Sequence, residues 1–403
     1  MLSFRRPLVP CLLVLALALS LLAGCPKPPA SPTPPPGPAP AAGAAPTGAP
    51  LKIGAILSLQ GPGAPLGTPE SSTLKLLEKS INAAGGINGR PLQIVIQDDQ
   101  SDETAALTAA KQLIENEKVL AVIGPSISGT SLAVMPTFEK AGVPLISCAA
   151  AVKITKPVNK WVFSTAQPDT LAVAKLMDYL KAKGIKQIAV LTDSNAFGSS
   201  GLEALKAQAG SQGLTIVAAE TFGSKDTSMT TQLTRIKGKS PQAIICWGTN
   251  PGPAIIAKNA KDLKLTIPLF MSHGVSNHKF VELAGPAAEG VIFPSGRILV
   301  ADFLAADDKQ KQGLLDFTKA YSAEYGTPPD HFAGHAWDAM QIIAAALKSS
   351  GDDRAKLRDA IEKTTGFVGI GGIFNLSATD HNGLTKDAFV LVTVKGGKWE
   401  IVK

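Results

Sequence analysis

Short apolar runs alternate with helix-forming segments along most of the chain, from Leu51 to Lys403. A strand that is apolar on both faces has to be buried on both faces, which is typical of a parallel sheet covered by helices. The pattern therefore predicts an α/β fold of doubly wound parallel sheets. The predicted strands are Lys52–Leu57, Leu92–Gln97, Leu120–Ile123, Pro144–Ile146, Gln187–Leu191, Thr215–Ala219, Ala243–Trp247, Pro268–Met271 and Val291–Phe293. The predicted helices include Thr73–Ala83, Glu103–Glu117, Thr130–Ala141, Thr170–Lys183 and Gly198–Gln212.

This body is longer than a single hydrophobic core usually extends, so two domains are expected. In doubly wound folds ligands bind at the carboxyl ends of the strands, and the loops there are rich in Gly, Ser, Thr and Asn. The end of the chain has a different pattern, in which a Gly396-Gly397 turn suits an antiparallel hairpin. Its predicted helices are Asp307–Tyr325 and Ala333–Ser349, and its predicted strands are Ile373–Asn375, Ala388–Val394 and Lys398–Val402.

The first residues have the pattern of an export signal. Arg5 and Arg6 precede an apolar run, Leu8–Leu22, which is shorter than the roughly 20 apolar residues of a membrane span. The run ends in Leu22-Ala23-Gly24-Cys25, which resembles the lipobox of bacterial lipoproteins. This resemblance implies that residues 1–24 are a signal peptide and that Cys25 is lipidated after cleavage. The alternatives are an ordinary signal peptide followed by an unrelated Cys, and a twin-Arg signal, whose flanking residues fit less well.

Residues 25–50 follow as a separate segment. From Pro26 to Pro50 the chain consists of Pro, Ala, Gly, Ser and Thr apart from Lys27, and such a composition buries no apolar surface and forms no helix. We expect an extended tether of about 3.1 Å per residue where polyproline II forms. With the lipid, it would hold the body beside a membrane of the bacterial cell envelope, on the periplasmic side.

Charge and cysteine content exclude some partners. The formal charge of +7 falls to about +5 without residues 1–24, and no basic stripe with interleaved aromatics is present, which argues against nucleic acid. The body contains only Cys148 and Cys246. An exported protein can pair its cysteines, but these two lie in apolar runs of different predicted domains, so we expect two buried free thiols.

Several ordered motifs resemble the type I periplasmic solute-binding proteins of branched-chain amino acid ABC transporters, over essentially all of Leu51–Lys403. The motifs are Gly61-Pro62-Gly63-Ala64-Pro65-Leu66-Gly67, Ile81-Asn82-Ala83-Ala84-Gly85-Gly86-Ile87-Asn88-Gly89-Arg90, Asp98-Asp99, Ile123-Gly124-Pro125-Ser126-Ile127-Ser128-Gly129-Thr130, Gly142-Val143-Pro144-Leu145-Ile146-Ser147 and Asp380-His381-Asn382-Gly383-Leu384. The resemblance implies two α/β lobes joined by three hinge crossings, with the ligand between them. Lobe 1 is expected at residues 51–167 plus 296–373, and lobe 2 at residues 168–295 plus 374–403.

The resemblance places a ligand carboxylate at Ser128, which is expected to cap the helix ending at Ala141. A hydroxyl, the unpaired N–H groups of a first helical turn and the helix dipole together suit an anion; a plain helix cap explains Ser128 as well. The resemblance also implies that Ala149, Ala150 and Ala151 present backbone groups to the ligand, although the hydroxyl usual in this loop is missing. Close packing of small residues is the alternative.

On the facing lobe, Phe197 matches a position that is usually Tyr and is expected to cover the ligand. Leu66 falls where some relatives have an aromatic, which makes that wall slimmer. Trp247 and Asn250 end a strand of lobe 2, where Trp247 either stacks on the ligand or belongs to the core. Packing within its own lobe is also the alternative role for Phe197.

His273 is the most informative departure from the family pattern. Amino-acid-binding relatives carry an acidic residue in this loop, which pairs with the ligand ammonium, whereas this chain has Met271-Ser272-His273-Gly274-Val275. A charged His repels an ammonium and a neutral His donates or accepts a hydrogen bond. We therefore expect a carboxylate without an ammonium, an aromatic acid among them, or an amide-like solute.

Other groups of polar residues in the sequence predict neither a metal site nor catalysis. His331 and His335 have helical metal-site spacing, but no further ligand accompanies them, so we expect a surface pair. Asp98 and Asp99 are interpreted as a strand-end feature. No phosphate loop, nucleophile elbow or dinucleotide spacing is present, so no cofactor, no metal and no enzyme activity are expected.

The leading functional hypothesis is a monomeric transport receptor that delivers a small polar ligand (an amino acid, an aromatic or other carboxylate, or an amide) to an ABC transporter permease. A ligand sensor of the same fold is the alternative, and an exported enzyme is the least supported, because no nucleophile with an adjacent base is found. The sequence leaves open the identity of the ligand and the choice between inner and outer membrane.

Overall fold

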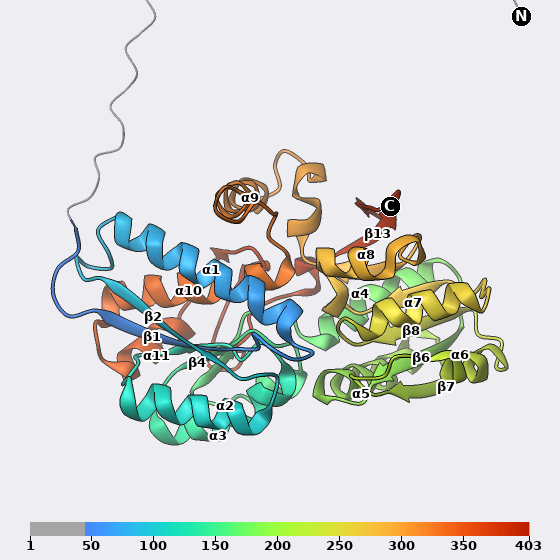
Figure 1. Cartoon of the computed structure of the whole chain (residues 1–403), viewed down its shortest axis with the longest axis horizontal. Helices are drawn as coiled ribbons and strands as arrows, with labels where there is room; N and C mark the ends of the chain where they lie inside the picture. The colour runs from blue at the N-terminus through green and yellow to red at the C-terminus, as the bar shows by residue number, and fades with distance from the viewer. Residues whose placement is uncertain (1–44, 403) are drawn as a thin grey trace, which may run out of the picture. The chain divides into compact units, whose positions relative to one another are not determined.

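Two sheets with helices on both faces confirm the predicted α/β architecture (Figure 1). The computed structural model describes residues 45–402, all within one compact unit. The predicted signal peptide, Cys25 and most of the tether lie outside the described residues. Within residues 45–402, no helix combines the length and apolar character needed to span a membrane.

The first sheet is parallel throughout and has the strand order β2-β1-β3-β4-β5. Strand order runs outward from β1 in both directions, which is the arrangement that places a crevice at the carboxyl ends of the strands. The strands are β1 (Leu51–Leu57), β2 (Leu92–Asp98), β3 (Val122–Ile123), β4 (Leu145–Ser147) and β5 (Val162–Ser164).

The second sheet has the order β14-β13-β10-β9-β8-β6-β7 and is parallel from β10 to β7. The last two strands pair antiparallel, and they form the hairpin predicted at Gly396-Gly397. The strands are β6 (Gln187–Asp193), β7 (Thr215–Phe222), β8 (Ala243–Trp247), β9 (Leu269–Met271), β10 (Ile292–Ser295), β13 (Val390–Lys395) and β14 (Lys398–Ile401).

Each sheet is buried between two layers of helices. The first sheet and its helices form lobe 1, and the second sheet and its helices form lobe 2. In lobe 1, α1 (Ala64–Ala83), α10 (His331–Ser350) and α11 (Arg354–Glu362) cover one face, and α2 (Glu103–Lys111) and α3 (Ser128–Ala141) cover the other. In lobe 2, α4 (Asp169–Ala182) and α5 (Ala196–Ala209) cover one face, and α6 (Thr230–Lys237), α7 (Gly252–Asp262) and α8 (His278–Ala284) cover the other. The remaining long helix, α9 (Lys311–Tyr325), packs beside α1.

Three local features differ from the sequence prediction. Strand β5 is missing from the prediction because it has only three residues and no long apolar run. Helix α1 begins at Ala64, nine residues before its predicted start at Thr73, because Gly67 is part of the helix and not of a loop. A Cβ at Gly67 would lie 2.2 Å from the carbonyl oxygen of Ser58, so this glycine serves close packing of α1 on the end of β1. The predicted helix Glu103–Glu117 is α at first and becomes a π-helical turn at Gln112–Asn116.

The N-terminal half of α10 holds two of the three segments that cross between the lobes, and one loop of lobe 1. Thr165 donates its hydroxyl to the carbonyl of His335 at 2.9 Å, and the N–H of Gly296 donates to His331 Nδ1 at 3.2 Å. Asp338 accepts the N–H groups of Ile370 and Gly371 at 2.6 and 2.7 Å. The first two crossings, at Thr165 and Gly296, are therefore attached to the same helix, which also holds the lobe 1 loop at Ile370 and Gly371.

The last crossing lies later than residue 373. Phe374, Leu376, Leu384 and Ala388 pack in the core of lobe 1 with β1 and α10. Phe389 packs with α4 and β8 of lobe 2 instead. We therefore propose that lobe 1 extends to about residue 388 and that lobe 2 resumes at β13.

Both cysteines of the body are buried and free, as the sequence predicts. Cys148 follows β4 in lobe 1, and Cys246 lies inside β8 in lobe 2. Burial raises the pKa of both thiols.

The packing of α5 on β8 generates a stability prediction. Alanine is normally favoured over glycine within a helix by about 0.5–1 kcal/mol. A Cβ at Gly201 would lie 2.1 Å from the ring of Trp247. We expect Gly201→Ala to lower the free energy of unfolding by about 1–3 kcal/mol through overpacking, measured by denaturant titration.

The matched control is Gly313→Ala in α9, where a Cβ meets no atom within 4 Å. This variant should keep or raise the stability by up to about 1 kcal/mol. Equal effects of the two substitutions would contradict the packing argument.

Candidate ligand-binding site

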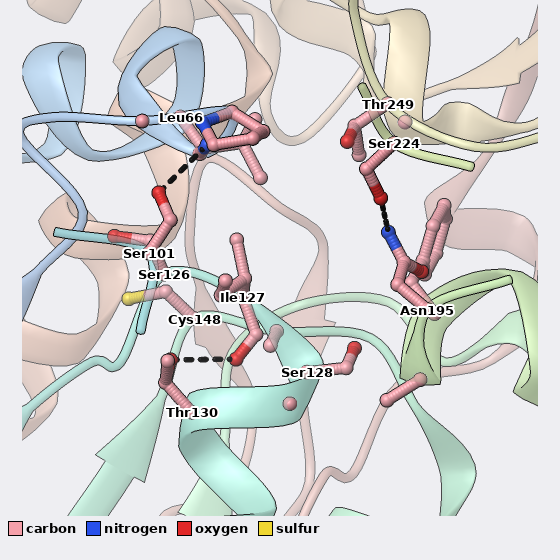
Figure 2. A pocket seen from close by; sticks show the side chains of 18 of the residues that line it. Leu66, Ser101, Ser126, Ile127, Ser128, Thr130, Cys148, Asn195, Ser224 and Thr249 are labelled. Atoms are coloured by element: carbon pink, nitrogen blue, oxygen red, sulfur yellow. Dashed lines mark hydrogen bonds between the residues drawn. The ribbon is translucent and has the colours of Figure 1, made fainter. Parts of the chain in front are cut away.

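A cavity of about 500 Å³ lies where the carboxyl ends of the two parallel sheets meet. Its lining comes from the segments that follow all five strands of lobe 1 and β6, β7, β8 and β9 in lobe 2, together with the start of α10. A cavity of this size accommodates a small molecule. Figure 2 shows it from close by, with lobe 1 residues such as Ser128 facing lobe 2 residues such as Asn195.

Six of the nine predicted ligand contacts line this cavity, and they come from both lobes. The six are Leu66, Ser128, Ala149, Ala150, Phe197 and His273. The other three, Ala151, Trp247 and Asn250, are buried beside the cavity without lining it. Direct contact of the six with a ligand remains a prediction.

The start of α3 differs in detail from its predicted form. Ser128 is the first residue of the helix and not its cap; the cap position belongs to Ile127, which has extended backbone angles. Ile127 has no capping side chain, and its carbonyl accepts the Ser131 N–H and the Thr130 hydroxyl. The Ser128 hydroxyl is therefore not used as a cap, and Figure 2 shows it on the side of α3 that faces lobe 2. The first N–H groups of a helix have no intrahelical partners and suit an anion.

The alanine loop after β4 has most of its backbone groups already engaged. Ala149 donates its N–H to Ser147 Oγ at 3.1 Å, and its carbonyl accepts the Ser164 hydroxyl at 3.2 Å. The carbonyl of Ala150 accepts the N–H of Asp169, and that of Ala151 accepts the N–H of Ile154. In this structure the loop therefore offers the cavity mainly methyl groups.

Aromatic rings in edge-to-face and tilted contact form the wall of lobe 2. Phe197 lines the cavity, and the ring of His273 meets it edge to face with centroids 5.4 Å apart. Trp247 lies behind them, fully buried, and its indole N–H donates to Asp169 Oδ1 at 2.9 Å. Asn250 is also turned away from the cavity, because its amide donates to Asn277 Oδ1 at 3.1 Å. Trp247 thus belongs to the core that supports the wall.

Three histidines meet beneath the cavity. His331 and His335, which the sequence predicts at the surface, are buried instead, because α10 carries them between the lobes. The ring of His331 lies 4.4 Å from that of His335 and 6.3 Å from that of His273. Burial lowers the pKa of His273 and of His331 to about 3, and that of His335 well below its usual value. All three are therefore neutral at physiological pH.

Several of these histidine nitrogens have no hydrogen-bond partner within residues 45–402. They are both ring nitrogens of His273, Nε2 of His331 and Nδ1 of His335. His273 and His335 also line the cavity. No group of His, Cys, Asp or Glu side chains suited to a metal ion is found in residues 45–402.

A ring of hydroxyl groups around the cavity is the feature that sequence reasoning missed. It comprises Ser101, Ser126, Thr130, Ser224 and Thr249. Their positions after strand ends were the available signal, because loops at that edge converge in a doubly wound fold. Ser224 connects two loops of lobe 2: it accepts the Asn195 amide at 3.2 Å and donates to Asp193 at 2.7 Å.

Charge around the cavity is distributed unevenly. Lobe 2 contributes no carboxylate to the lining and one cation, Lys225, which is exposed. The acids in the lining, Asp102 and Glu103, are exposed residues of lobe 1. Asp98 and Asp99 do not line the cavity; they accept backbone N–H groups of Leu59, Gln100 and Ser101 and so hold the strand-end loops.

Comparison with known proteins identifies the family. The family model described as "Periplasmic binding protein" matches residues 50–398. The "Leucine-, isoleucine-, valine-, threonine-, and alanine-binding protein" of Pseudomonas aeruginosa is 26% identical over 318 residues, which cover 78% of this chain and 83% of that protein.

Two solved structures extend the comparison. An extracellular ligand-binding receptor from Rhodopseudomonas palustris HaA2 has a TM-score of 0.83 and 28% identity, and covers 88% of this chain and 100% of that one. A solute-binding protein of an ABC transporter from R. palustris, in complex with benzoate, has a TM-score of 0.76 and 27% identity, and covers 88% and 96%.

The unpartnered ring of His273 generates a prediction of pH-dependent stability. The pKa of His273 is about 3 in the folded state and 6.5 in the unfolded state. Between these pH values only the unfolded state takes up the proton, so the free energy of unfolding of wild type decreases as the pH falls below 6.5. We expect His273→Leu to gain about 2 kcal/mol relative to wild type when the pH is lowered from 7 to 5. Denaturant titrations at both pH values measure this difference.

Met271→Leu is the control, because it changes packing two residues earlier without removing a titratable group. Its stability relative to wild type should be the same at both pH values. If the stability of His273→Leu relative to wild type is also the same at both pH values, His273 is not held neutral by burial.

Proposed function

The chain belongs to the periplasmic binding protein family, and we propose that it is an extracytoplasmic solute-binding lipoprotein that delivers a small carboxylate to an ABC importer. The observation that carries this proposal is the cavity of about 500 Å³ between the carboxyl ends of the two sheets. It brings residues of both lobes to one ligand-sized space. Membership of a family of binding proteins makes it a site for capture and not for catalysis.

The start of α3 supports a ligand with a carboxylate. Ser128 and Thr130 lie in the first helical turn and line the cavity together with Ser126. Hydroxyl groups and the free N–H groups of a helix start bind an anion without a buried cation. The buried groups at the floor are neutral histidines, so they neither pair with the carboxylate nor repel it.

The wall of lobe 2 supports a ligand without an ammonium group. An α-amino acid needs an acceptor with negative charge for its ammonium when it is removed from water. The lobe 2 lining contains Phe197, His273 and Lys225 but no carboxylate. The Pseudomonas relative is named for amino acids, whereas the R. palustris protein holds benzoate. We propose that this chain takes an aromatic or other simple carboxylate, or an amide-like solute.

Capture follows from closure of the two lobes. Two of the three crossing segments are held on α10, and the lobes can rotate as rigid bodies about the crossings. A ligand that contacts both lobes stabilises the closed population. We propose that the closed, monomeric form docks on a transporter permease while a lipid on Cys25 keeps it at the membrane.

The ligand class generates a binding prediction. A ligand that binds only the folded state raises the melting temperature. We expect benzoate or a related carboxylate to raise it and leucine to leave it unchanged, in a thermal-shift screen of amino acids, aromatic acids, short carboxylates and amides. A sub-micromolar dissociation constant for leucine or valine in calorimetry would overturn the ligand argument and keep the transport role.

Ser128→Ala tests where the carboxylate binds. Loss of a hydrogen bond to a charged group should weaken the carboxylate found in the screen by about tenfold or more. Ser199→Ala is the matched control, because Ser199 lies in the first turn of α5 but is exposed and outside the lining. Equal affinities of the two variants would place the carboxylate elsewhere.

Lipid anchoring is tested separately from ligand binding. We expect a bacterial host to deliver the full-length protein to the membrane fraction, and Cys25→Ser to release it, because the proposed lipid is attached to the Cys25 thiol. Labelled fatty acid should be incorporated by wild type and not by Cys25→Ser. Incorporation by the variant would exclude Cys25 as the attachment site.

A further inference from the structure

Glu70 is a buried carboxyl group directly behind the cavity. It lies on α1, is fully inaccessible to solvent, and bonds through Oε2 to the Ser126 hydroxyl. Its other oxygen, Oε1, has no hydrogen-bond partner among the described residues. An ionised carboxylate in such surroundings would be left with a single donor, which is very costly away from water.

Several groups around Glu70 favour its neutral form. Burial raises the pKa of Glu70 well above 4.5, the Ser126 hydrogen bond opposes this, and the nearby carboxyl groups of Asp330 and Asp99 raise it further. The Cys148 thiol also faces it. On the outer part of α1, Lys79 is paired with Glu324 of α9 at 2.8 Å and is exposed.

Ser126 connects Glu70 to the cavity. It follows β3, lines the cavity, and its Oγ accepts the N–H of Ser58 at 3.1 Å. A serine hydroxyl has one proton to donate and two lone pairs that accept. With one lone pair used by Ser58, the state of Glu70 decides where the Ser126 proton points.

We propose that Glu70 carries a proton that turns the Ser126 hydroxyl toward the ligand, so that the protein binds a carboxylate together with a proton. Neutral Glu70 donates its O–H to Ser126 Oγ, which leaves the Ser126 proton free to be donated to the ligand carboxylate. Ionised Glu70 instead accepts that proton, and Ser126 then presents only oxygen to the cavity. Glu70 is thus a positioning residue that acts through Ser126.

This inference rests on the proposed carboxylate site and adds a pH dependence to it. The ligand anion favours neutral Glu70, and ionised Glu70 repels the anion both directly and through Ser126. Binding above the pKa that Glu70 has in the ligand-free protein must therefore take up a proton. No bond other than O–H is made or broken.

The test is calorimetry of the purified protein with benzoate from pH 6 to 10, in pairs of buffers with different ionisation heats. For wild type we expect the dissociation constant to be constant at first and then to rise toward tenfold per pH unit, while proton uptake approaches one per ligand. Glu70→Gln keeps a neutral N–H donor to Ser126 at every pH. We expect Glu70→Gln to bind benzoate without the proton uptake seen in wild type. At the alkaline end of the pH range it should bind benzoate more tightly than wild type.

Two further variants test the role of Ser126 and control for the loss of a buried carboxyl group. Ser126→Ala should weaken benzoate binding about tenfold or more at pH 6, because it loses the donor itself. Asp169→Asn removes another fully buried carboxyl, in lobe 2, and should retain the wild-type pH profile. Circular dichroism and melting temperature confirm that each variant is folded.

A flat wild-type profile without buffer-dependent heats would overturn the coupling, as would an unchanged profile in Glu70→Gln. Either result would leave carboxylate binding itself intact. Absence of benzoate binding by wild type and Glu70→Gln at every pH would instead contradict the carboxylate site on which the inference rests.

Discussion

The attachment of two crossing segments to the N-terminal half of α10 is the interaction on which the cavity depends. One helix supplies the His335 carbonyl to Thr165, the His331 ring to Gly296 N–H, and the Asp338 carboxyl to the Ile370 and Gly371 N–H groups. Because Thr165 and Gly296 lie at two of the three crossings between the lobes, α10 fixes two of the three paths on which the relative position of the sheets depends. The carboxyl ends of both sheets then face each other across one space.

This arrangement forces titratable groups into the space between the lobes. Burial raises the pKa of Asp338 to about 8 despite its two N–H donors, and lowers the pKa of His331 to about 3. Both groups are thus driven toward their neutral forms. The ion pairs that join the lobes, Lys153–Glu203 and Lys386–Asp178, are exposed, and exposed pairs cost little to break when the lobes move, unlike buried ones.

The sequence was sufficient for the fold because apolar runs and helical periodicity report burial directly, as the match of Ala243–Trp247 with β8 shows. It was also sufficient for the general position of the site, since loops at strand ends converge by topology. It was insufficient for contacts set by three-dimensional packing. Trp247 is the last residue of β8, but it is turned into the core by a hydrogen bond to Asp169, 78 residues away. His331 and His335 have a surface-like spacing, and only the position of α10 between the lobes buries them.

The same limit explains why Glu70 gave no signal. In the sequence it is one acid in the first half of a helix, and its partner Ser126 is 56 residues away. Only burial makes the pair significant, because a carboxyl with one partner and no solvent has a proton affinity unlike that of an exposed acid. The buried groups around the proposed anion site are neutral and its one lining lysine, Lys225, is exposed, so the attraction comes mainly from oriented dipoles: the start of α3 and the hydroxyl groups of Ser126 and Ser128. Dipoles of this kind are selective only while their protons point inward, and control of the Ser126 proton by Glu70 is therefore control of the site itself.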